Sequence, residues 1–270
     1  MLILTLRQRT AIPLEMQGIL PSVLAGKSNA ELAKLPLRHG NRIEDAGDHF
    51  VIEGSADDLT LHIAGDTECL KSIGYGMETG AILVAGAAGI HAGAQMTGGS
   101  LVIAGDAGDW LGAEMRGGTI QVHGSVGSYA GGAYRGSRRG MTGGEMRIRG
   151  SAGDELGSTM RRGSILCGGS CGSFAGAGMI AGTIVVQGNL GPRAGSNMKR
   201  GTIITFDEPI QIPSGFRDCG VQNLVFLRLL QKDLGSRNLL NGQSTPWGEC
   251  RVYKGDVLTG GNGELLIVGI

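Results

Sequence analysis

The chain has 270 residues, with 24 basic and 24 acidic side chains, so its formal net charge is zero. This balance does not favour a nucleic acid or an anionic membrane surface as a partner. Glycine is frequent, at 51 residues, but it does not recur at every third position, which excludes a collagen-like triple helix.

The cysteines and the apolar segments bear on the cellular compartment. The five cysteines (Cys69, Cys167, Cys171, Cys219 and Cys250) are odd in number and scattered, which argues against a disulfide framework. The first residues do not show the pattern of a secretory signal peptide, and no apolar run reaches the roughly 18 residues of a membrane-spanning helix. We therefore expect a cytoplasmic protein without a membrane partner.

Residues 1–58 are predicted to form an N-terminal cap with a strand and a short helix. Leu2, Leu4 and Leu6 alternate with other residues, which is typical of a strand. Ser28 and Glu31 have the spacing of a capping box, and Pro36 would stop the helix that follows. Residues 49–53 and 59–64 are predicted to be further strands.

Residues 59–206 are dominated by one phrase that is repeated about seven times. Copies begin at Met77, Met96, Met115, Met141, Met160, Met179 and Met198. Five of the six intervals are 19 residues, and the remaining one is 26, so one copy carries a seven-residue insertion. Self-similarity at a fixed period of this length indicates a solenoid.

Glycine recurs at fixed places of the phrase, where we expect corners that need positive φ or close approach of stacked backbones. These predicted corners include Gly86, Gly89, Gly93, Gly105, Gly108, Gly112, Gly188, Gly191 and Gly195. The sixth and eighth places are apolar, as Ile82 and Val84 are in the first copy, which predicts a short strand with one buried face. Methionine at the first place is expected to form an internal stack.

These features predict an all-β fold, a right-handed parallel β-helix of about seven coils with small N- and C-terminal α/β caps. Residues 207–270 would form the C-terminal cap. Within it, residues 222–234 have helical spacing with Gly235 as a C-cap signal, and Leu224, Val225, Leu227, Leu230 and Leu234 supply its apolar positions. Residues 251–253 and 265–268 are predicted to be closing strands.

Several local motifs suggest chemistry, but each is explained more simply by its sequence context. Residues 21–28 resemble a P-loop, except that Pro21 stands where the first glycine belongs. Residues 168–172 match G-x-S-x-G, yet their glycines are regular places of the phrase. Cys167 and Cys171 replace small core residues, and the turn residues Asp106, Asp109 and Asp154 are expected to be solvated. The five histidines lack short zinc-binding spacings, so no catalytic or metal site is predicted.

Two features suggest that the outer surface binds a partner or a ligand. The outward strand places are apolar near both ends of the array, at Leu83, Val102, Leu166 and Ile204, but polar in the middle. Either a partner protein covers these strips or the terminal segments fold back over them. The insertion, residues 134–140, supplies arginines for a basic patch that could bind an anion or a partner: Arg135, Arg138, Arg139, Arg147 and Arg149. A solvated loop is the alternative.

The repeat, with its G-x-x-G-x-x-x-G pattern at Gly86, Gly89 and Gly93, resembles a known glycine-repeat domain. That domain is shared by the C-terminal part of glutamate synthase large subunits and by the C subunit of formylmethanofuran dehydrogenase. The whole chain is similar to the second, because the segment Asn29 to Asn41, ahead of the repeats, also resembles the N-terminal region of that protein.

The resemblance implies a non-catalytic structural subunit of a one-carbon enzyme complex, with the A, B and D subunits as partners. The preferred complex is the methylotroph formyltransferase/hydrolase, which moves formyl from tetrahydromethanopterin to a methanofuran analogue and releases formate. The resemblance places the metal in other subunits and implies no cofactor in this chain. The carrier's glutamate-rich tail is a candidate ligand for the basic insertion.

Three alternatives remain open at this stage. The first is the C subunit of a molybdenum or tungsten formylmethanofuran dehydrogenase, which reduces CO2. The second is a detached structural domain of the glutamate synthase type. The third is an independent enzyme with a groove along the β-helix, which should carry stacked acidic residues. The seventh places instead hold residues such as Val102, Gln121 and Arg147.

Overall fold

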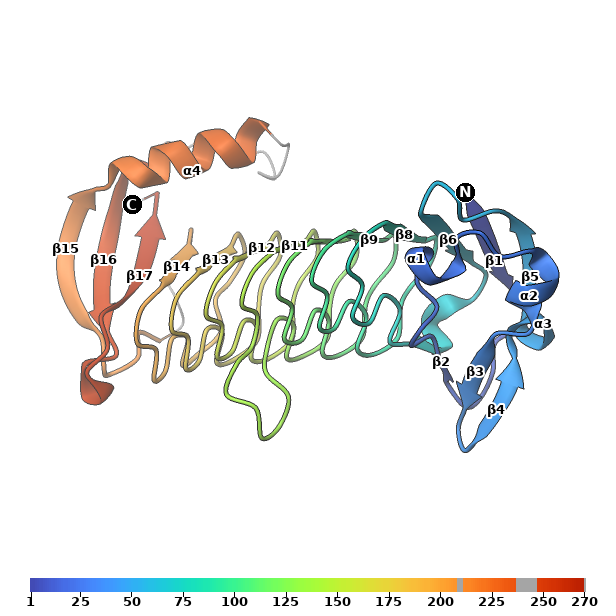
Figure 1. Cartoon of the computed structure of the whole chain (residues 1–270). Coiled ribbons are helices and arrows are strands. Elements are labelled where there is room, and N and C mark those ends of the chain that lie inside the picture. The colour runs from blue at the N-terminus through green and yellow to red at the C-terminus, as the bar shows by residue number, and fades with distance from the viewer. Residues whose placement is uncertain (208–210, 237–246, 270) are drawn as a thin grey trace.

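The computed structural model describes residues 1–207, 211–236 and 247–269. These residues form mostly strands with few helices, consistent with the predicted all-β class. One mixed sheet has 13 strands in the order β15-β16-β17-β14-β13-β12-β11-β10-β9-β8-β6-β1-β5, and a second sheet has the order β4-β3-β2-β7. The molecule is elongated, with the repeats stacked along its length between two differently built ends (Figure 1).

Each copy of the phrase contributes one four-residue strand to the large sheet. The strands are β8 (Ala81–Val84), β9 (Ser100–Ile103), β10 (Thr119–Val122), β11 (Glu145–Ile148), β12 (Ser164–Cys167), β13 (Thr183–Val186) and β14 (Thr202–Thr205). All neighbours in this series pair in parallel, and each place pairs with the same place of the next copy, as Ile82 does with Leu101. The sixth and eighth places of the phrase lie on these strands. The apolar residues at these places are buried, which confirms the prediction of one buried face.

A second parallel column runs through the twelfth place of the phrase. It consists of isolated bridges that join Ala88, Ala107, Val126, Ala152, Cys171 and Leu190 in turn. Beside it, side-chain oxygens accept backbone N–H groups of the following copy. Asp106 Oδ1 accepts from Ser125 at 2.7 Å, and Asp154 Oδ1 accepts from Ser173 at 2.7 Å. The aspartates expected to be merely solvated therefore satisfy backbone donors that the short strands leave unpaired.

The methionines at the first place form the predicted internal column. All seven are fully buried: Met77, Met96, Met115, Met141, Met160, Met179 and Met198. The side-chain end of Met160 lies under the glycine at the fourth place of the next copy, so a Cβ atom on Gly182 would be 2.8 Å from Met160 Cε. Glycine at that place therefore makes room for the methionine column.

The predicted corner glycines act in two different ways. At the seventeenth place Gly93, Gly112 and Gly195 have positive φ. At the tenth and thirteenth places the backbone instead lies against the previous copy. A Cβ atom on Gly108 would be 2.9 Å from the backbone nitrogen of Ile90. Positive φ favours glycine, and the close backbone contact leaves no room for a side chain.

The N-terminal residues extend the large sheet. Strand β1 (Leu2–Leu6) pairs in parallel with β6 (Thr60–Ala64) and antiparallel with β5 (Phe50–Gly54). The second sheet contains β2 (Leu14–Glu15), β3 (Pro36–His39), β4 (Arg42–Asp45) and β7 (Leu70–Lys71). Short helical segments lie between β2 and β3 and in the connections between the two sheets. These segments are α1 (Pro21–Leu24), α2 (Asn29–Ala33), α3 (Ala46–His49) and η1 (Thr67–Cys69). The predicted capping box is confirmed, since both Ser28 and Glu31 make their reciprocal bonds at α2.

The C-terminal residues continue the sheet and then return along it. Strand β17 (Gly263–Val268) pairs in parallel with β14, while β16 (Glu249–Gly255) and β15 (Arg217–Asn223) add antiparallel strands; η2 (Val257–Thr259) precedes β17. Helix α4 (Val225–Ser236) begins later than predicted because residues 217–223 belong to β15. Gly235 lies inside the helix, so its predicted role as a C-cap is wrong. None of the described helices combines the length and apolarity needed to cross a membrane.

Candidate functional site

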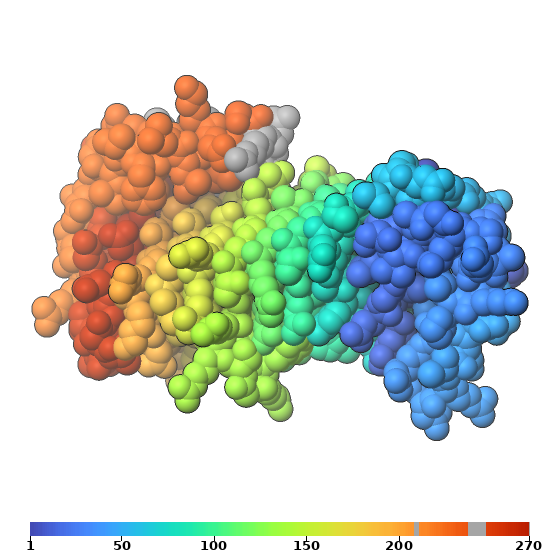
Figure 2. Space-filling view, viewed as in Figure 1, coloured from blue at the N-terminus to red at the C-terminus, as the bar shows by residue number. Residues whose placement is uncertain are grey.

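The outer face of the C-terminal repeats is covered by the chain itself. Leu166, Val185 and Ile204 are buried in a second apolar cluster together with residues of α4, β16 and β17 and with Trp247. Leu227 and Leu234 of α4 point into this cluster and are buried. The fold-back alternative therefore accounts for the apolar strip at this end. Figure 2 shows α4 over the C-terminal half of the stack, with the same face open further along.

The opposite side of α4 is also apolar, although nothing in the described chain covers it. Val225 is 67% exposed, Leu229 is 65% exposed and Phe226 is 42% exposed. Val221, at the end of β15, adds a further exposed side chain. We name these four residues the α4 patch. The sequence placed Val225 with the apolar positions of the helix but could not show that it faces outward, because α4 has apolar residues on two sides.

The outer face of the N-terminal repeats is open. Leu83 is 39% exposed, and Val102 on the next strand is half-buried. Further along, Gln121 Nε2 lies 2.9 Å from His123 Nε2, and Arg147 pairs with Glu145 on its own strand. This face therefore changes from apolar to polar along the stack, as predicted.

The inserted loop is anchored by an aromatic cluster that the sequence prediction missed. Tyr134 donates to or accepts from His91 Nδ1 at 3.0 Å, and its ring lies 5.2 Å from that of Trp110. Trp110 in turn stacks on Tyr129 at 4.3 Å with an angle of 7°. His91, Trp110 and Tyr129 share the fifteenth place of the phrase, so their 19-residue spacing was a readable signal. Burial raises the pKa of Tyr134 to about 12 and lowers the pKa of His91.

The predicted arginines come from two elements. Arg135, Arg138 and Arg139 are exposed on the inserted loop, which projects from the edge of the stack opposite α4 (Figure 1). Arg147 lies on β11, and Arg149 follows it and is exposed. Because Tyr134 is held by His91 and Trp110, the position at which the loop leaves the stack is fixed.

The motifs that suggested chemistry are structural. Ser170 Oγ accepts the N–H of Asn189 at 3.0 Å, as a member of the side-chain ladder. Cys167 is fully buried, and burial raises the pKa of its thiol to about 12, which suppresses the reactive thiolate. In the P-loop-like segment, the N–H of Gly26 donates to Asp57 Oδ1 at 3.0 Å rather than pointing at an open phosphate site.

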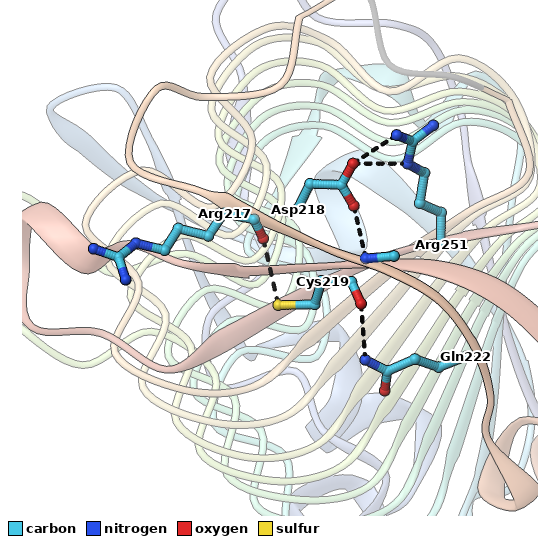
Figure 3. Close-up of polar contacts among 6 residues, drawn as sticks. Arg217, Asp218, Cys219, Gln222 and Arg251 are labelled. Carbon is cyan, nitrogen blue, oxygen red and sulfur yellow. Dashed lines mark hydrogen bonds and ion pairs between the residues drawn. The ribbon is translucent and has the colours of Figure 1, made fainter.

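Strand β15 is one of the two edge strands of the large sheet. Asp218 binds Arg251 on β16 through two hydrogen bonds of 2.6 and 3.1 Å and accepts the N–H of Gly220 (Figure 3). These contacts lower the pKa of Asp218, with the Arg251 bond as the largest cause. The pairing is irregular between Asp218 and Val221. A bulge and charges of this kind protect an edge strand against unwanted pairing.

One group of potential metal ligands occurs among the described residues, at His39, Glu44 and His49. His39 Nδ1 and His49 Nε2 lie 2.9 and 2.7 Å from the same Oε2 atom of Glu44. The sequence predicted no metal site because the residues are five positions apart, which is not one of the short spacings. The β3–β4 hairpin and α3 bring them together.

No family model matches the chain. Among curated proteins, it is 39% identical over 97 residues to the C subunit of the tungsten-containing formylmethanofuran dehydrogenase 2 of Methanothermobacter thermautotrophicus. It is 37% identical over 84 residues to the C subunit of the molybdenum-containing formylmethanofuran dehydrogenase 1 of Methanosarcina barkeri. These matches cover 34% and 30% of this chain and only 36% and 28% of the relatives, about a third of their length.

The likeness to a solved structure extends over the whole chain. A chain of the formyltransferase/hydrolase complex from Methylorubrum extorquens, solved in complex with methylofuran, matches with a TM-score of 0.90 and 36% identity. The match covers 99% of this chain and 100% of that one. The protein therefore belongs to the family of formylmethanofuran dehydrogenase C subunits, which includes the matching chain of the formyltransferase/hydrolase complex.

Proposed function

We propose that this chain is a non-catalytic structural subunit of a formyltransferase/hydrolase complex. That complex would move formyl from tetrahydromethanopterin to a methanofuran analogue and release formate, in the cytoplasm. The observation that carries the proposal is the full-length match to a chain of such a complex, at 36% identity. The buried thiols and the serines of the side-chain ladder, which are occupied by structural contacts, support a scaffold rather than a catalyst.

The proposal includes the architecture. Residues 59–206 would form a right-handed parallel β-helix, since parallel crossovers favour that hand. Residues 1–58 and 207–270 would act as caps. The two parallel columns, one through the strands and one through Ala88 and its equivalents, support this description. A rigid rod of this kind offers separate faces to several subunits at once.

The A, B and D subunits are the proposed partners, and the α4 patch is the proposed contact with one of them. Four exposed apolar residues on one helix face and the strand before it are typical of a protein interface, whose centre is poor in charge. The loop arginines Arg135, Arg138 and Arg139 remain proposed contacts for an anionic partner surface or the glutamate-rich tail of the carrier. Arg147 and Arg149 belong to the strand face on which α4 packs further along, away from the loop, so they would contact such a partner separately. Apart from its glutamate-rich tail, the methanofuran-type carrier would bind other subunits. Tetrahydromethanopterin and the catalytic metal would also bind there.

A second candidate is the C subunit of a molybdenum or tungsten formylmethanofuran dehydrogenase. The identities of 39% and 37% to such proteins favour it, although they extend over about a third of each chain. The two candidates share the scaffold and differ in the metal and the other subunits.

Affinity purification of the chain from its native cells separates these candidates. We expect the A, B and D subunits to co-purify in a fixed ratio, without molybdenum or tungsten. Either of these two metals in stoichiometric amount would instead support the dehydrogenase. Recovery of the chain from these cells as a monomer, with no other subunit bound, would contradict both.

A further inference from the structure

We propose that His39, Glu44 and His49 form a binding site for a divalent transition-metal ion, with Zn²⁺ as the ion that fits best. The set consists of two imidazole nitrogens and one carboxylate oxygen, and their three ligand atoms all lie within 4.8 Å of one another. Two histidines and a glutamate are a ligand set that zinc uses in proteins, with a fourth position left to water.

The distances require only small side-chain movements. Zinc binds nitrogen and oxygen at about 2.0–2.1 Å, so neighbouring ligands of a tetrahedral ion lie roughly 3.3 Å apart. The two observed distances to Glu44 Oε2, 2.9 and 2.7 Å, are shorter than this. An ion at the centre would widen them by about half an ångström and replace the two hydrogen bonds with coordination bonds.

The backbone holds the ligands from two sides. His39 ends β3 and Glu44 lies on the adjacent strand β4, where their hairpin is closed by Gly40 with φ of 63°. His49 ends α3, whose first residue, Ala46, donates its N–H to the carbonyl of Leu35 at 2.8 Å. The ligands therefore converge from regular elements, which restricts their positions better than a free loop would.

The hydrogen bonds of the triad identify which ring nitrogen of His39 would bind the ion. Both histidines direct a ring nitrogen to one carboxylate oxygen, while the buried Nε2 of His39 has no hydrogen-bond partner in the described structure. Because the two ring nitrogens of an imidazole point in different directions, Nδ1, which faces Glu44, is the His39 atom that an ion in the triad would bind, and Nε2 lies outside the site.

An open cavity adjoins the cluster and gives the ion a route and a place for its fourth ligand. It has a volume of about 390 Å³. Its lining consists of Arg7, Gln8, Thr10, His39, Asp48 and His49. The side chain of Glu44 is 28% exposed, so solvent also reaches the carboxylate. Asp48 and water in this cavity are the available oxygen donors beside the triad, which gives a three-ligand site with an exchangeable fourth position.

The test is an anomalous-scattering map at the zinc absorption edge, on crystals of the assembly in which the full chain purifies, soaked with zinc salt. We expect a peak between His39 Nδ1 and His49 Nε2, about 2 Å from each nitrogen. Absence of a peak at the triad, while zinc is seen elsewhere in the same crystals, would overturn the proposal.

Zinc content of variants gives an independent measurement. In the same assembly, Glu44→Gln and His49→Asn should each lose one zinc per chain, whereas Glu53→Gln and His123→Asn should lose none. Glu53 and His123 are exposed residues outside the triad and serve as matched controls. Unchanged zinc content in both triad variants would reject the site. If a variant does not assemble, the map of the unmodified assembly decides the question alone.

Discussion

At the scale of single residues, the fold depends on contacts between equivalent places of successive copies. Met160 and Gly182 are one such pair, because the methionine fills the space that a side chain at the glycine would need. The sequence could predict both members, since methionine and glycine recur at fixed places of the phrase. It could not show that they touch each other, because that contact depends on how one copy is placed over the next.

Replacing Gly182 with alanine tests this pairing. Gly182 has φ of 111°, and the new Cβ would lie 2.8 Å from Met160 Cε and 3.0 Å from the carbonyl oxygen of Gly163. Backbone strain and overpacking together should lower the free energy of unfolding by about 3 kcal/mol or more. Urea denaturation measures this change.

Gly136→Ala is the matched control, because Gly136 also has positive φ, of 89°, but nothing lies within 4 Å of its Cβ position. It should cost on the order of 1 kcal/mol, from backbone strain alone. Equal losses in the two variants would show that the methionine column does not require glycine at this place.

His91 predicts a pH dependence of stability. Burial, followed by the charge of Lys71, lowers the pKa of His91 from its usual 6.5 in the folded chain. Below pH 6.5 the unfolded chain therefore binds a proton that folded His91 resists, so stability falls as the pH falls from 6.5 toward the lower folded pKa. Carboxylates such as Glu44 and Asp218, whose pKa values are lowered from 4.5 and 3.8, act at more acidic pH.

When the pH is lowered from one unit above 6.5 to one unit below it, the free energy of unfolding should therefore fall less in His91→Gln than in the unmodified chain. Urea midpoints at the two pH values measure the difference. His123→Gln, at an exposed position, should retain the dependence of the unmodified chain. An unchanged dependence in His91→Gln would mean that His91 titrates as freely in the folded state as in the unfolded state.

At the scale of elements, α4 combines a structural side and an exposed side. The sequence predicted the helix and most of its apolar positions, but it began the helix at residue 222 and left open what covers the repeats. That question depends on which side of α4 faces the stack. Two apolar sides separated by few polar residues give no periodicity that would identify the buried one.

Two leucines on α4 separate these roles. Leu227 is fully buried against the outer face of the repeats, whereas Leu229 is 65% exposed. Leu227→Ala should lower the free energy of unfolding by about 2–5 kcal/mol, because it leaves a cavity in the second apolar cluster. Leu229→Ala should change it by about 0.5 kcal/mol or less. Similar losses in thermal or urea unfolding of both variants would contradict the described orientation of α4.

At the scale of the whole molecule, the stack is extended by strands at both ends and carries one face that the chain covers only in part. The sequence predicted the repeated body and the existence of caps. It did not show that β1, β5 and β17 continue the same sheet, because the strands with which they pair are remote in sequence. The triad at His39 was missed because its residues are five positions apart, a spacing that becomes a cluster only through the β3–β4 hairpin and α3.

The α4 patch predicts how assembly can be weakened without unfolding the chain. A charge at a buried interface position costs about 2 kcal/mol or more, so Leu229→Glu should weaken partner binding roughly 30-fold. Lys34→Glu introduces the same side chain at an exposed residue directly after α2, at the other end of the molecule, and should have a smaller effect. Quantitative co-purification of the partner proteins measures both. Equal recovery with Leu229→Glu and the unmodified chain would exclude the patch as an interface.

The proposed role of this chain is to assemble the complex without carrying out chemistry itself. The most direct measurement is to express the A, B and D subunits with and without this chain, and to compare the mass of the assembly and its formyl transfer per transferase molecule. We predict that the full assembly forms only when the chain is present, and that the chain alone has no formyl-transfer activity. Formyl transfer by the isolated chain, or an assembly of the same composition without it, would contradict the account.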